Sequence, residues 1–399
     1  MARTGEMLAY DMSSAAPASA GVTLSRLVVT DFRSYAQAEL RLDERPVVLT
    51  GENGAGKTNL LEALSLLSPG RGLRGAAHHE IARAGGPGGW AVAATLETQE
   101  GPLRLGTGIE PGEEAVSRTR LVRVDGKQAS GPSVLAQHLR MLWLTPAMDR
   151  LFLEAASDRR RFLDRLVMGL DPAHGTRVNA YERALRERNR LLSENILDPS
   201  WLGGIEEQMA EYGVAIAAAR LETLGRLRGA LDAAEDLLGA GRPFPRAELA
   251  LDGTLECELE TAAAVDVEEN FRRQLAETRL RDAGAGRTLS GPHRTDLAVR
   301  HIAKDREARL CSTGEQKALL IGIVLANARM LFAHGVPPLL LLDEIAAHLD
   351  ETRRAALFDE IVNLRLQAFM TGTDAGLFEA LGNRALSFRV ENGAFLELN

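Results

Sequence analysis

The chain has 399 residues, of which 45% are hydrophobic and 26% are charged. This composition is typical of a globular protein with two or three subdomains, and it excludes the collagen-like, disordered and membrane-spanning classes. The formal net charge of -8 argues at first against a nucleic-acid partner, because nucleic-acid-binding domains usually carry a basic surface. Two cysteines are too few for a disulfide framework, which favours a cytoplasmic protein.

The first portion of the chain predicts a mixed α/β domain. Residues 1–21 are small and polar and are expected to form a flexible tail. Over residues 22–150, short runs rich in Val, Leu and Thr alternate with Gly and Pro clusters, which predicts strands separated by turns. The expected strands cover 22–32, 38–44, 46–50, 90–98, 102–110 and 119–125.

The middle and the end of the chain differ in character. Over residues 151–285, Leu and Ala recur at three- and four-residue spacing, which predicts a helical insertion. Over residues 286–399 the α/β pattern returns, so we predict a single head formed from the N- and C-terminal portions. Its expected elements are an apolar helix over 314–332, a strand of four leucines over 339–342, a helix containing Arg353 and Arg354, and a strand over 367–373.

Residues 51–58 read GENGAGKT, the pattern of a phosphate-binding loop between a strand and a helix. The glycines permit a turn whose backbone N–H groups point at phosphates, and the helix N-terminus adds partial positive charge. Lys57 is expected to reach the outer phosphates, and the Thr58 hydroxyl to bind Mg²⁺. The alternative is an ordinary turn with an exposed lysine, which the flanking strand and helix disfavour.

The predicted strand 339–342 ends in Asp343 and Glu344. Four leucines followed by two carboxylates are typical of a buried parallel strand whose carboxyl end opens into a site. We expect Asp343 to hold Mg²⁺ and Glu344 to act as the catalytic base that orients or deprotonates the attacking water. On its own, the same pattern also fits a buried strand that ends in two surface acids.

A third motif, CSTGEQKALL, covers residues 311–320. The simple interpretation is a helix start, with Ser312 or Thr313 as the N-cap and Glu315 completing a capping box. The N–H groups of such a start also make an anion site, which fits a protein that already carries a phosphate-binding loop.

In combination, GENGAGKT, STGEQK, LLLLDE and HLD (348–350) resemble the nucleotide-binding head of the ABC-type ATPases of chromosome maintenance. The phrases DFRSY (31–35), SGPHRTDL (290–297) and QAFMTGTD (367–374) narrow the resemblance to the RecF family of recombination mediators. It implies an ABC-type P-loop ATPase head with an inserted α-helical arm. It also implies a cytoplasmic protein that binds ATP and Mg²⁺, dimerises with ATP, binds gapped, duplex and single-stranded DNA, and works with RecR and RecO to load the recombinase.

The resemblance also assigns site residues. Ser312, Gly314 and Gln316 would contact the nucleotide of a partner subunit, and Asp350 would bridge the two sites. Arg71 and Arg74 are equally consistent with a phosphate contact and a solvated loop, and Gln137 is a weak candidate for a Mg²⁺-sensing glutamine. The subunit's own ATP site would comprise Arg33, Gly51, Glu52, Asn53, Gly54, Ala55, Gly56, Lys57, Thr58, Asp343 and Glu344.

Two departures from the family pattern modify this expectation. The strand end MTGTD offers Thr371, Thr373 and Asp374 where many relatives have a switch histidine, so we expect slow, DNA-stimulated hydrolysis that acts as a timer. Thr313 replaces the usual glycine of the signature. His293 and His348 are the histidines that lie inside motifs, and both are expected to be hydrogen-bonded residues rather than catalysts.

Arginine is concentrated at both borders of the insertion, over residues 150–190 and 272–300. These helices are expected to follow DNA phosphates without reading bases, although each arginine alone is as well explained by a solvated face paired with local acids. Residues 247–270 carry eight acids and no Lys or Arg, so DNA is expected to avoid them. The DNA candidates are Arg159, Arg160, Arg161, Arg186 and Arg190, within a wider set that includes Arg165, Arg183 and Arg188.

Two other functions remain as alternatives. A chromosome-organising clamp would need long coiled-coil arms, whereas the insertion lacks heptads and a zinc-binding C-x-x-C hook. A P-loop ATPase that acts on a small molecule would not need the STGEQK motif.

Overall fold

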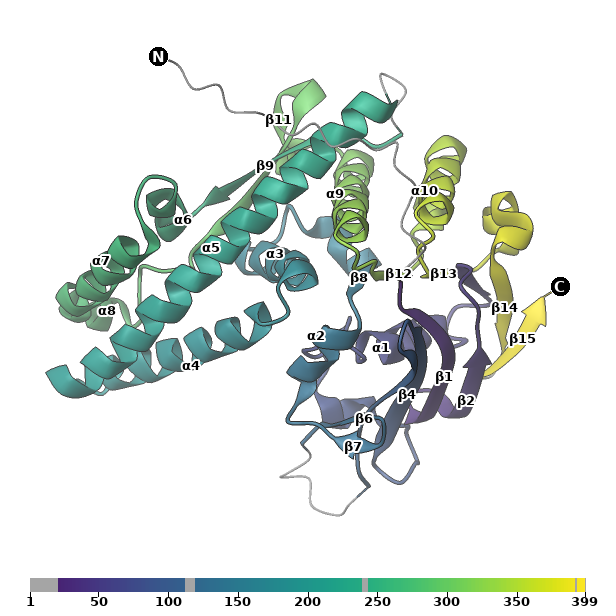
Figure 1. Ribbon diagram of the computed structural model, residues 1–399, viewed down its shortest axis with the longest axis horizontal. Coiled ribbons are helices and arrows are strands. Elements are labelled where there is room, and N and C mark those ends of the chain that lie inside the picture. Colours follow the sequence, from purple (N-terminus) through teal and green to yellow (C-terminus); the bar gives the residue numbers. More distant parts are fainter. Residues whose placement is uncertain (1–20, 112–118, 239–242, 392, 399) are drawn as a thin grey trace.

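The computed structural model describes residues 21–111, 119–238, 243–391 and 393–398. The expected tail, apart from Gly21, lies outside these ranges. The described chain forms a head with two large sheets and a helical arm that extends from one side of it (Figure 1).

The central sheet of the head combines strands from both sides of the insertion, which confirms the predicted split head. Its six strands run in the order β15-β14-β3-β13-β12-β8, and all neighbours are parallel except β14 and β15. The strands β3 and β12 are buried on both faces, as their unbroken apolar sequences predict. The bounds are β3 (Val47–Thr50), β8 (Met141–Leu144), β12 (Leu339–Leu342), β13 (Ala368–Gly372), β14 (Leu386–Glu391) and β15 (Ala394–Leu398).

The second sheet is antiparallel and contains the strands predicted in the first portion of the chain. Its order is β2-β1-β4-β5-β6-β7. Helix α1 (Lys57–Ser65) packs between the two sheets, because Leu60, Leu61 and Leu64 share one apolar core with residues of both. The bounds are β1 (Thr23–Phe32), β2 (Tyr35–Arg41), β4 (Trp90–Thr98), β5 (Gly101–Ile109), β6 (Leu121–Val124) and β7 (Lys127–Gln128), and the short helix α2 (Leu135–His138) follows.

Helices α9 (Thr313–Ala333) and α10 (Glu351–Asn363) cover the other face of the central sheet (Figure 1). By length and composition alone α9 resembles a membrane span, but 83% of its apolar window is buried inside the protein. It is therefore the core helix of the head.

The insertion begins with three helices, α3 (Ala156–Leu170), α4 (His174–Ser193) and α5 (Pro199–Leu238), and continues through α6 (Thr254–Leu259), α7 (Ala264–Glu277) and α8 (Arg279–Ala285). It is not wholly helical. Strand β9 (Ala247–Asp252) pairs with β10 (Asp296–His301), which also pairs with β11 (Arg306–Glu307). The reason is the period-two pattern of β9, in which Ala247 and Leu249 are buried and Glu248 is exposed.

The arm and the head share elements, so no physical break occurs at residue 151. Phe162 and Leu166 of α3 lie in the same apolar core as α9 and β12. The long helix α5 contributes Ala217 to the arm core and Leu224 to the head core. The arm is therefore attached through a continuous helix and not through a linker.

Arg188 corrects one prediction, because it is fully buried in the arm and is not available to DNA. Its guanidinium donates to Glu206 at 3.1 Å, to Asp282 at 2.8 Å and to the Thr288 hydroxyl at 2.7 Å. It also donates to the Leu275 carbonyl oxygen at 2.7 Å. A buried charge of this kind joins α4, α5, α7 and α8 by satisfied hydrogen bonds.

We expect Arg188→Met to lower the free energy of unfolding by about 3–5 kcal/mol, because it leaves the buried Asp282 carboxylate without its arginine and leaves Glu206 paired with Arg279 alone. Chemical denaturation measures the effect. Arg183→Met, on the exposed side of the same helix, is the matched control and is expected to change stability by less than about 0.5 kcal/mol. Equal stabilities of the two variants would contradict the structural role of Arg188.

Candidate nucleotide-binding site

The GENGAGKT loop joins β3 to α1 at the carboxyl end of the central sheet. Gly51, Gly54 and Gly56 all have positive φ, which side chains disfavour. A Cβ atom at Gly51 would lie 2.5 Å from the Val390 carbonyl oxygen, and one at Gly56 would lie 2.8 Å from the Tyr35 hydroxyl. The loop therefore follows a path that only glycine permits at these positions.

Lys57 folds back over this loop. Its Nζ donates to the carbonyl oxygens of Gly51 at 2.6 Å and Glu52 at 2.9 Å, and the residue is 4% exposed. Burial lowers the pKa of Lys57, and the nearby carboxylates of Glu344 and Asp343 oppose that shift. The ammonium group is thus held at the loop, beside both members of the acidic pair.

The Thr58 hydroxyl donates to Asp343 at 2.9 Å, although the two residues are 285 positions apart in the chain. This contact joins the phosphate-binding loop of the N-terminal portion to the acidic pair of the C-terminal portion. Asp343 is buried, with 5% exposure. Since Thr58 gives its proton to Asp343, its oxygen lone pairs are left for a metal ion.

Thr371, at the end of β13, contacts both members of the acidic pair. Its hydroxyl donates to Asp343 Oδ1 at 2.8 Å and accepts from the backbone N–H of Glu344 at 2.9 Å. Glu344 itself has a φ of 52°, in the left-handed region. From the sequence, Thr371 is notable only as one of the residues where many relatives have a switch histidine, although a lone hydroxyl near the end of an otherwise apolar buried strand also indicates a role for it.

The DFRSY turn wraps around the start of α1. The Tyr35 hydroxyl donates to the Gly56 carbonyl oxygen at 2.9 Å, and Asn59 donates to the Ser34 hydroxyl at 2.9 Å. Arg33 lies in the same turn, but its guanidinium donates to the buried carboxylate of Glu62 at 2.8 Å. Arg74 also pairs with Glu62, at 2.8 Å, whereas Arg71 and Gln137 are exposed. The charge of Arg33 is therefore shared with Glu62.

A cavity of about 780 Å³ opens along residues 50–55 and is closed on its other side by Asp374, Arg389 and Glu391. Its volume is within the range of pockets that bind small molecules and cofactors. Glu52, Asn53 and Gly54 are exposed along it, and Ala55 is half-buried. An exposed glycine-rich loop with a lysine, at a helix N-terminus, fits a triphosphate.

The residues present also fit Mg²⁺. The Thr58 hydroxyl and the Asp343 carboxylate supply the oxygen ligands that this ion prefers. In the described part of the chain, no group of three or more His, Cys, Asp or Glu residues is placed to hold a metal ion by itself. Phosphate oxygens and water would therefore complete the coordination.

The STGEQK motif begins α9, and the capping box predicted there is confirmed: Glu315 accepts from the Ser312 backbone N–H at 3.0 Å. Its ion pair with Lys304, followed by this backbone bond, lowers the pKa of Glu315 to about 2. Ser312, Thr313 and Gly314 are exposed. Gln316 differs from the expectation: it is buried and donates to the Cys311 carbonyl oxygen at 2.8 Å, because its side chain folds toward the preceding turn.

The HLD motif leads into α10. Asp350 is exposed and caps this helix, since its carboxylate accepts from the Arg353 backbone N–H at 2.8 Å. His348 is exposed. His293 is held between the Tyr181 hydroxyl at 2.8 Å and the Thr288 carbonyl oxygen at 3.0 Å, and burial lowers its pKa to about 4. His293 is therefore hydrogen-bonded as expected, whereas the His348 ring forms no hydrogen bond with any described residue.

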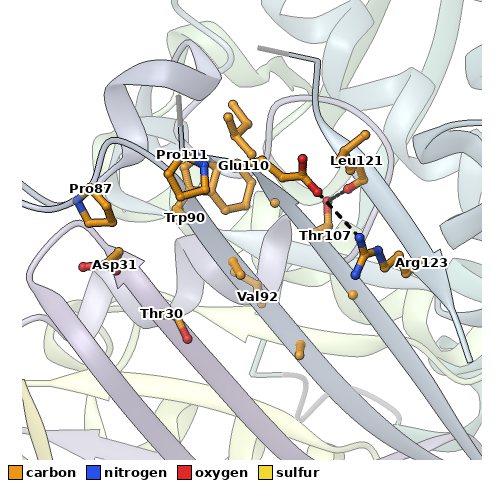
Figure 2. Close-up of a pocket in the computed structure, with 16 residues that line it drawn as sticks. Thr30, Asp31, Pro87, Trp90, Val92, Thr107, Glu110, Pro111, Leu121 and Arg123 are labelled. Atoms are coloured by element: carbon orange, nitrogen blue, oxygen red, sulfur yellow. Dashed lines mark hydrogen bonds and ion pairs between the residues drawn. The ribbon is translucent and has the colours of Figure 1, made fainter. Parts of the chain in front are cut away.

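A separate hollow of about 380 Å³ lies on the outer face of the antiparallel sheet (Figure 2). Its lining includes the small residues Ala91, Ala93, Gly106 and Gly108, and two of its charged groups, Glu110 and Arg123, face each other at 3.6 Å. It contains no residue of the phosphate-binding motifs. Of these two hollows, only the cavity beside Gly51 is lined by the phosphate-binding loop.

The profile of one protein family matches almost the whole chain. Residues 23–394 match the family described as RecF/RecN/SMC N terminal domain. The chain belongs to this family.

Relatives within the family place the chain beside its RecF members. The DNA replication and repair protein RecF of Rhizobium leguminosarum bv. trifolii (strain WSM2304) is 58% identical over 377 residues, which cover 94% of this chain and 99% of that protein. The RecF protein of Mesorhizobium japonicum (strain LMG 29417 / CECT 9101 / MAFF 303099) is 54% identical over 371 residues, which cover 93% of this chain and 96% of that protein. The RecF family resemblance drawn from the motifs is confirmed.

Solved structures confirm the fold of the family. A structure of the recombination mediator protein RecF-ATPrS in the RecFOR pathway has a TM-score of 0.80 at 22% identity and covers 95% of this chain and 98% of that chain. An Smc head domain from Pyrococcus furiosus has a TM-score of 0.51 at 14% identity, and the match covers 95% of this chain and 96% of that chain. The predicted α/β head of the ABC and SMC type is therefore correct.

The arm arginines of this RecF-family chain differ in their partners. Arg159 pairs with Asp296 at 2.7 Å, and Arg190 pairs with Glu187 at 2.7 Å and with Glu194 at 2.8 Å. Arg161 pairs with Asp158, and Arg186 with Glu182. Arg160 is different: it donates to the Thr295 carbonyl oxygen at 2.8 Å and makes no ion pair with any described residue. Arg165 stacks on the ring of Trp143, 3.8 Å from its centre, and burial lowers its pKa to about 9.

We expect Lys57→Met to weaken ATP binding by roughly 10- to 100-fold, since hydrogen bonds to charged groups contribute about 1.5–3 kcal/mol. A titration with a fluorescent ATP analogue measures the affinity. Lys127→Met, at an exposed lysine of the short strand β7, is the control and is expected to bind normally. Unchanged affinity of Lys57→Met would contradict the assignment of this loop to phosphate.

Proposed function

We propose that this chain is an ATP-dependent DNA-binding protein of recombinational repair and replication restart. The observation that carries the proposal is the hydrogen bond between Thr58 and Asp343, which brings the two halves of a Mg²⁺–ATP site together across the inserted arm. The names of its relatives, DNA replication and repair protein RecF, support the pathway. Partners of the chain would be RecR and RecO, in keeping with the RecFOR pathway named for the solved relative.

The site residues have distinct roles in this proposal. The loop from Gly51 to Gly56 and Lys57 bind the phosphates, and Thr58 and Asp343 hold Mg²⁺. The bound ion neutralises charge on the phosphates. Glu344 orients or deprotonates the attacking water, and the absence of an imidazole from MTGTD favours slow turnover.

A second subunit would complete the site. The exposed start of α9, at Ser312 and Gly314, offers N–H groups to an anion but faces solvent in the single chain. In an ATP-closed homodimer this surface would cover the partner's phosphates, and the exposed Asp350 would lie at the junction. ATP binding and dimerisation would then be coupled in one equilibrium.

Ser312→Arg is expected to keep ATP binding and to lose the ATP-dependent dimer, because a long side chain at the exposed helix start would block the partner's phosphates. Sedimentation velocity with and without ATP distinguishes monomer from dimer. Lys304→Arg, which keeps the charge paired with Glu315, serves as the control. A Ser312→Arg protein that still dimerises with ATP would refute the composite site.

The proposed DNA contact is to phosphates. The candidate arginines can be ranked by whether a carboxylate already pairs with them. Arg160 and its exposed neighbour Arg294 make no ion pair with any described residue, whereas Arg190 is held by two carboxylates. Burial lowers the pKa of Arg160, and the nearby Arg220 and Arg294 lower it further, whereas the carboxylates of Asp296 and Asp164 oppose the shift. A DNA phosphate would relieve this like-charge contact.

We therefore expect Arg160→Ala to reduce the slope of log affinity against log salt by about 1 for gapped duplex DNA. Arg190→Ala removes the same formal charge and is expected to leave the slope unchanged. Fluorescence anisotropy at several salt concentrations provides the measurement. The opposite ranking of the two variants would contradict the choice of Arg160.

A further inference from the structure

We propose that Thr371 is the positioning residue of the ATPase site: through one hydroxyl it aims Asp343 at the metal and fixes the backbone from which Glu344 reaches the attacking water. This inference rests on the proposed ATPase function. It concerns a residue of β13 that lies outside the phosphate-binding loop, the signature and the acidic pair.

The hydroxyl of Thr371 is fully committed. The residue is 0% exposed and sits among Phe369, Met370 and Gly372, where water does not compete. A hydroxyl has a single proton, and here that proton goes to Asp343 Oδ1 at 2.8 Å while the oxygen accepts from the Glu344 N–H at 2.9 Å. Both interactions therefore require the same rotamer of one side chain.

The first interaction fixes the direction of Asp343. Its Oδ1 atom accepts from Thr371 on one side and from Thr58, at 2.9 Å, on the other. Two hydroxyl donors from different elements leave the carboxylate little rotational freedom. If Thr371 were lost, Asp343 would be oriented by Thr58 alone, which is itself a candidate metal ligand.

The second interaction fixes the direction of Glu344. With a φ of 52°, Glu344 has a left-handed backbone that is unfavourable for a residue with a side chain. Its carboxylate forms no hydrogen bond or ion pair with any described residue, so the position of the backbone sets the point from which the side chain extends. The bond from its N–H to Thr371 is the contact that holds this backbone in place.

A purely structural role for Thr371 predicts a different result from a positioning role. If the hydroxyl only satisfied a buried N–H group, its loss would weaken the whole site equally, with and without metal. If it aims Asp343 and Glu344, the loss affects Mg²⁺ dependence and hydrolysis but spares metal-free nucleotide binding, which depends on the loop from Gly51 to Lys57.

The test compares Thr371→Val, which keeps the shape and removes the hydroxyl, with Thr371→Ser, which keeps the hydroxyl. Nucleotide affinity is measured in EDTA and across a Mg²⁺ titration, and hydrolysis is measured in single turnovers. For Thr371→Val we expect affinity in EDTA within about twofold of the parent, a Mg²⁺ requirement raised at least about tenfold, and hydrolysis slowed at least about tenfold. For Thr371→Ser, we expect the affinity in EDTA, the Mg²⁺ requirement and the rate of hydrolysis each to stay within about threefold of the parent.

Thermal unfolding shows whether each variant folds, and Glu344→Gln, which removes the proposed catalytic base, gives the reference rate of turnover. Should Thr371→Val fail to fold, Thr371→Ser and Thr371→Ala form the deciding pair, because they differ by one oxygen atom. Equal loss of affinity in EDTA and in Mg²⁺, parent-like hydrolysis by Thr371→Val, or unfolding of both Val and Ala variants would overturn the proposal. If the parent itself neither binds ATP nor exceeds Glu344→Gln in turnover, the proposed ATPase function fails instead.

Discussion

The parallel pairing of β13 with β3 on one side and with β12 on the other is the constraint on which the site depends. Thr50 is in register with Gly372, and Leu342 with Met370, so three carboxyl ends meet at one edge of the sheet. Ligand sites of open α/β sheets form at such edges. The three strands deliver Thr58, Asp343 and Thr371, and hydrogen bonds of 2.8 to 2.9 Å join these side chains. The insertion follows β8, which is the outermost strand of this sheet. Its length therefore does not change how β3, β13 and β12 pair with one another.

The arm and the head are joined by one helix that packs in both of their cores. Helix α5 places Leu224 and Leu227 in the head core and Val214 and Ala217 in the arm core. Between α5 and β9 the chain passes α10, where Arg353 donates to the Pro243 carbonyl oxygen at 2.9 Å. Arg353 is also the residue whose N–H is capped by Asp350. One side chain therefore links the HLD segment to the part of the insertion that joins α5 to β9.

Local motifs predicted the site better than they predicted the surroundings. The phosphate-binding loop, the acidic pair and the start of α9 each lie within a short stretch, so spacing alone identifies them. The role of Thr371 depends on strand pairing between distant segments, which no local pattern encodes. The burial of Arg188 was predictable in part. The residue lies on the same face of α4 as Tyr181, Ala184 and Leu191, and helical spacing predicts that this face packs in the core. Strand β9 was missed because its acidic composition concealed a period-two pattern.

Counting charges in the sequence is misleading both for the whole chain and for the borders of the insertion, and for the same reason. The net charge of -8 argued against DNA, and the arginine-rich borders of the insertion argued for it, yet both counts ignore which charges are already paired. Glu256, one of the acids of residues 247–270, is 1% exposed and accepts from Thr295 at 2.9 Å, so it repels nothing at the surface. Arg159 is likewise neutralised by Asp296. Exposed ion pairs contribute little and exchange easily, whereas an arginine without a carboxylate keeps its charge for an incoming phosphate. For the DNA contact that we propose, the arginines to test first are therefore those, such as Arg160 and Arg294, that make no ion pair with any described residue, and the density of arginine in the sequence does not identify them.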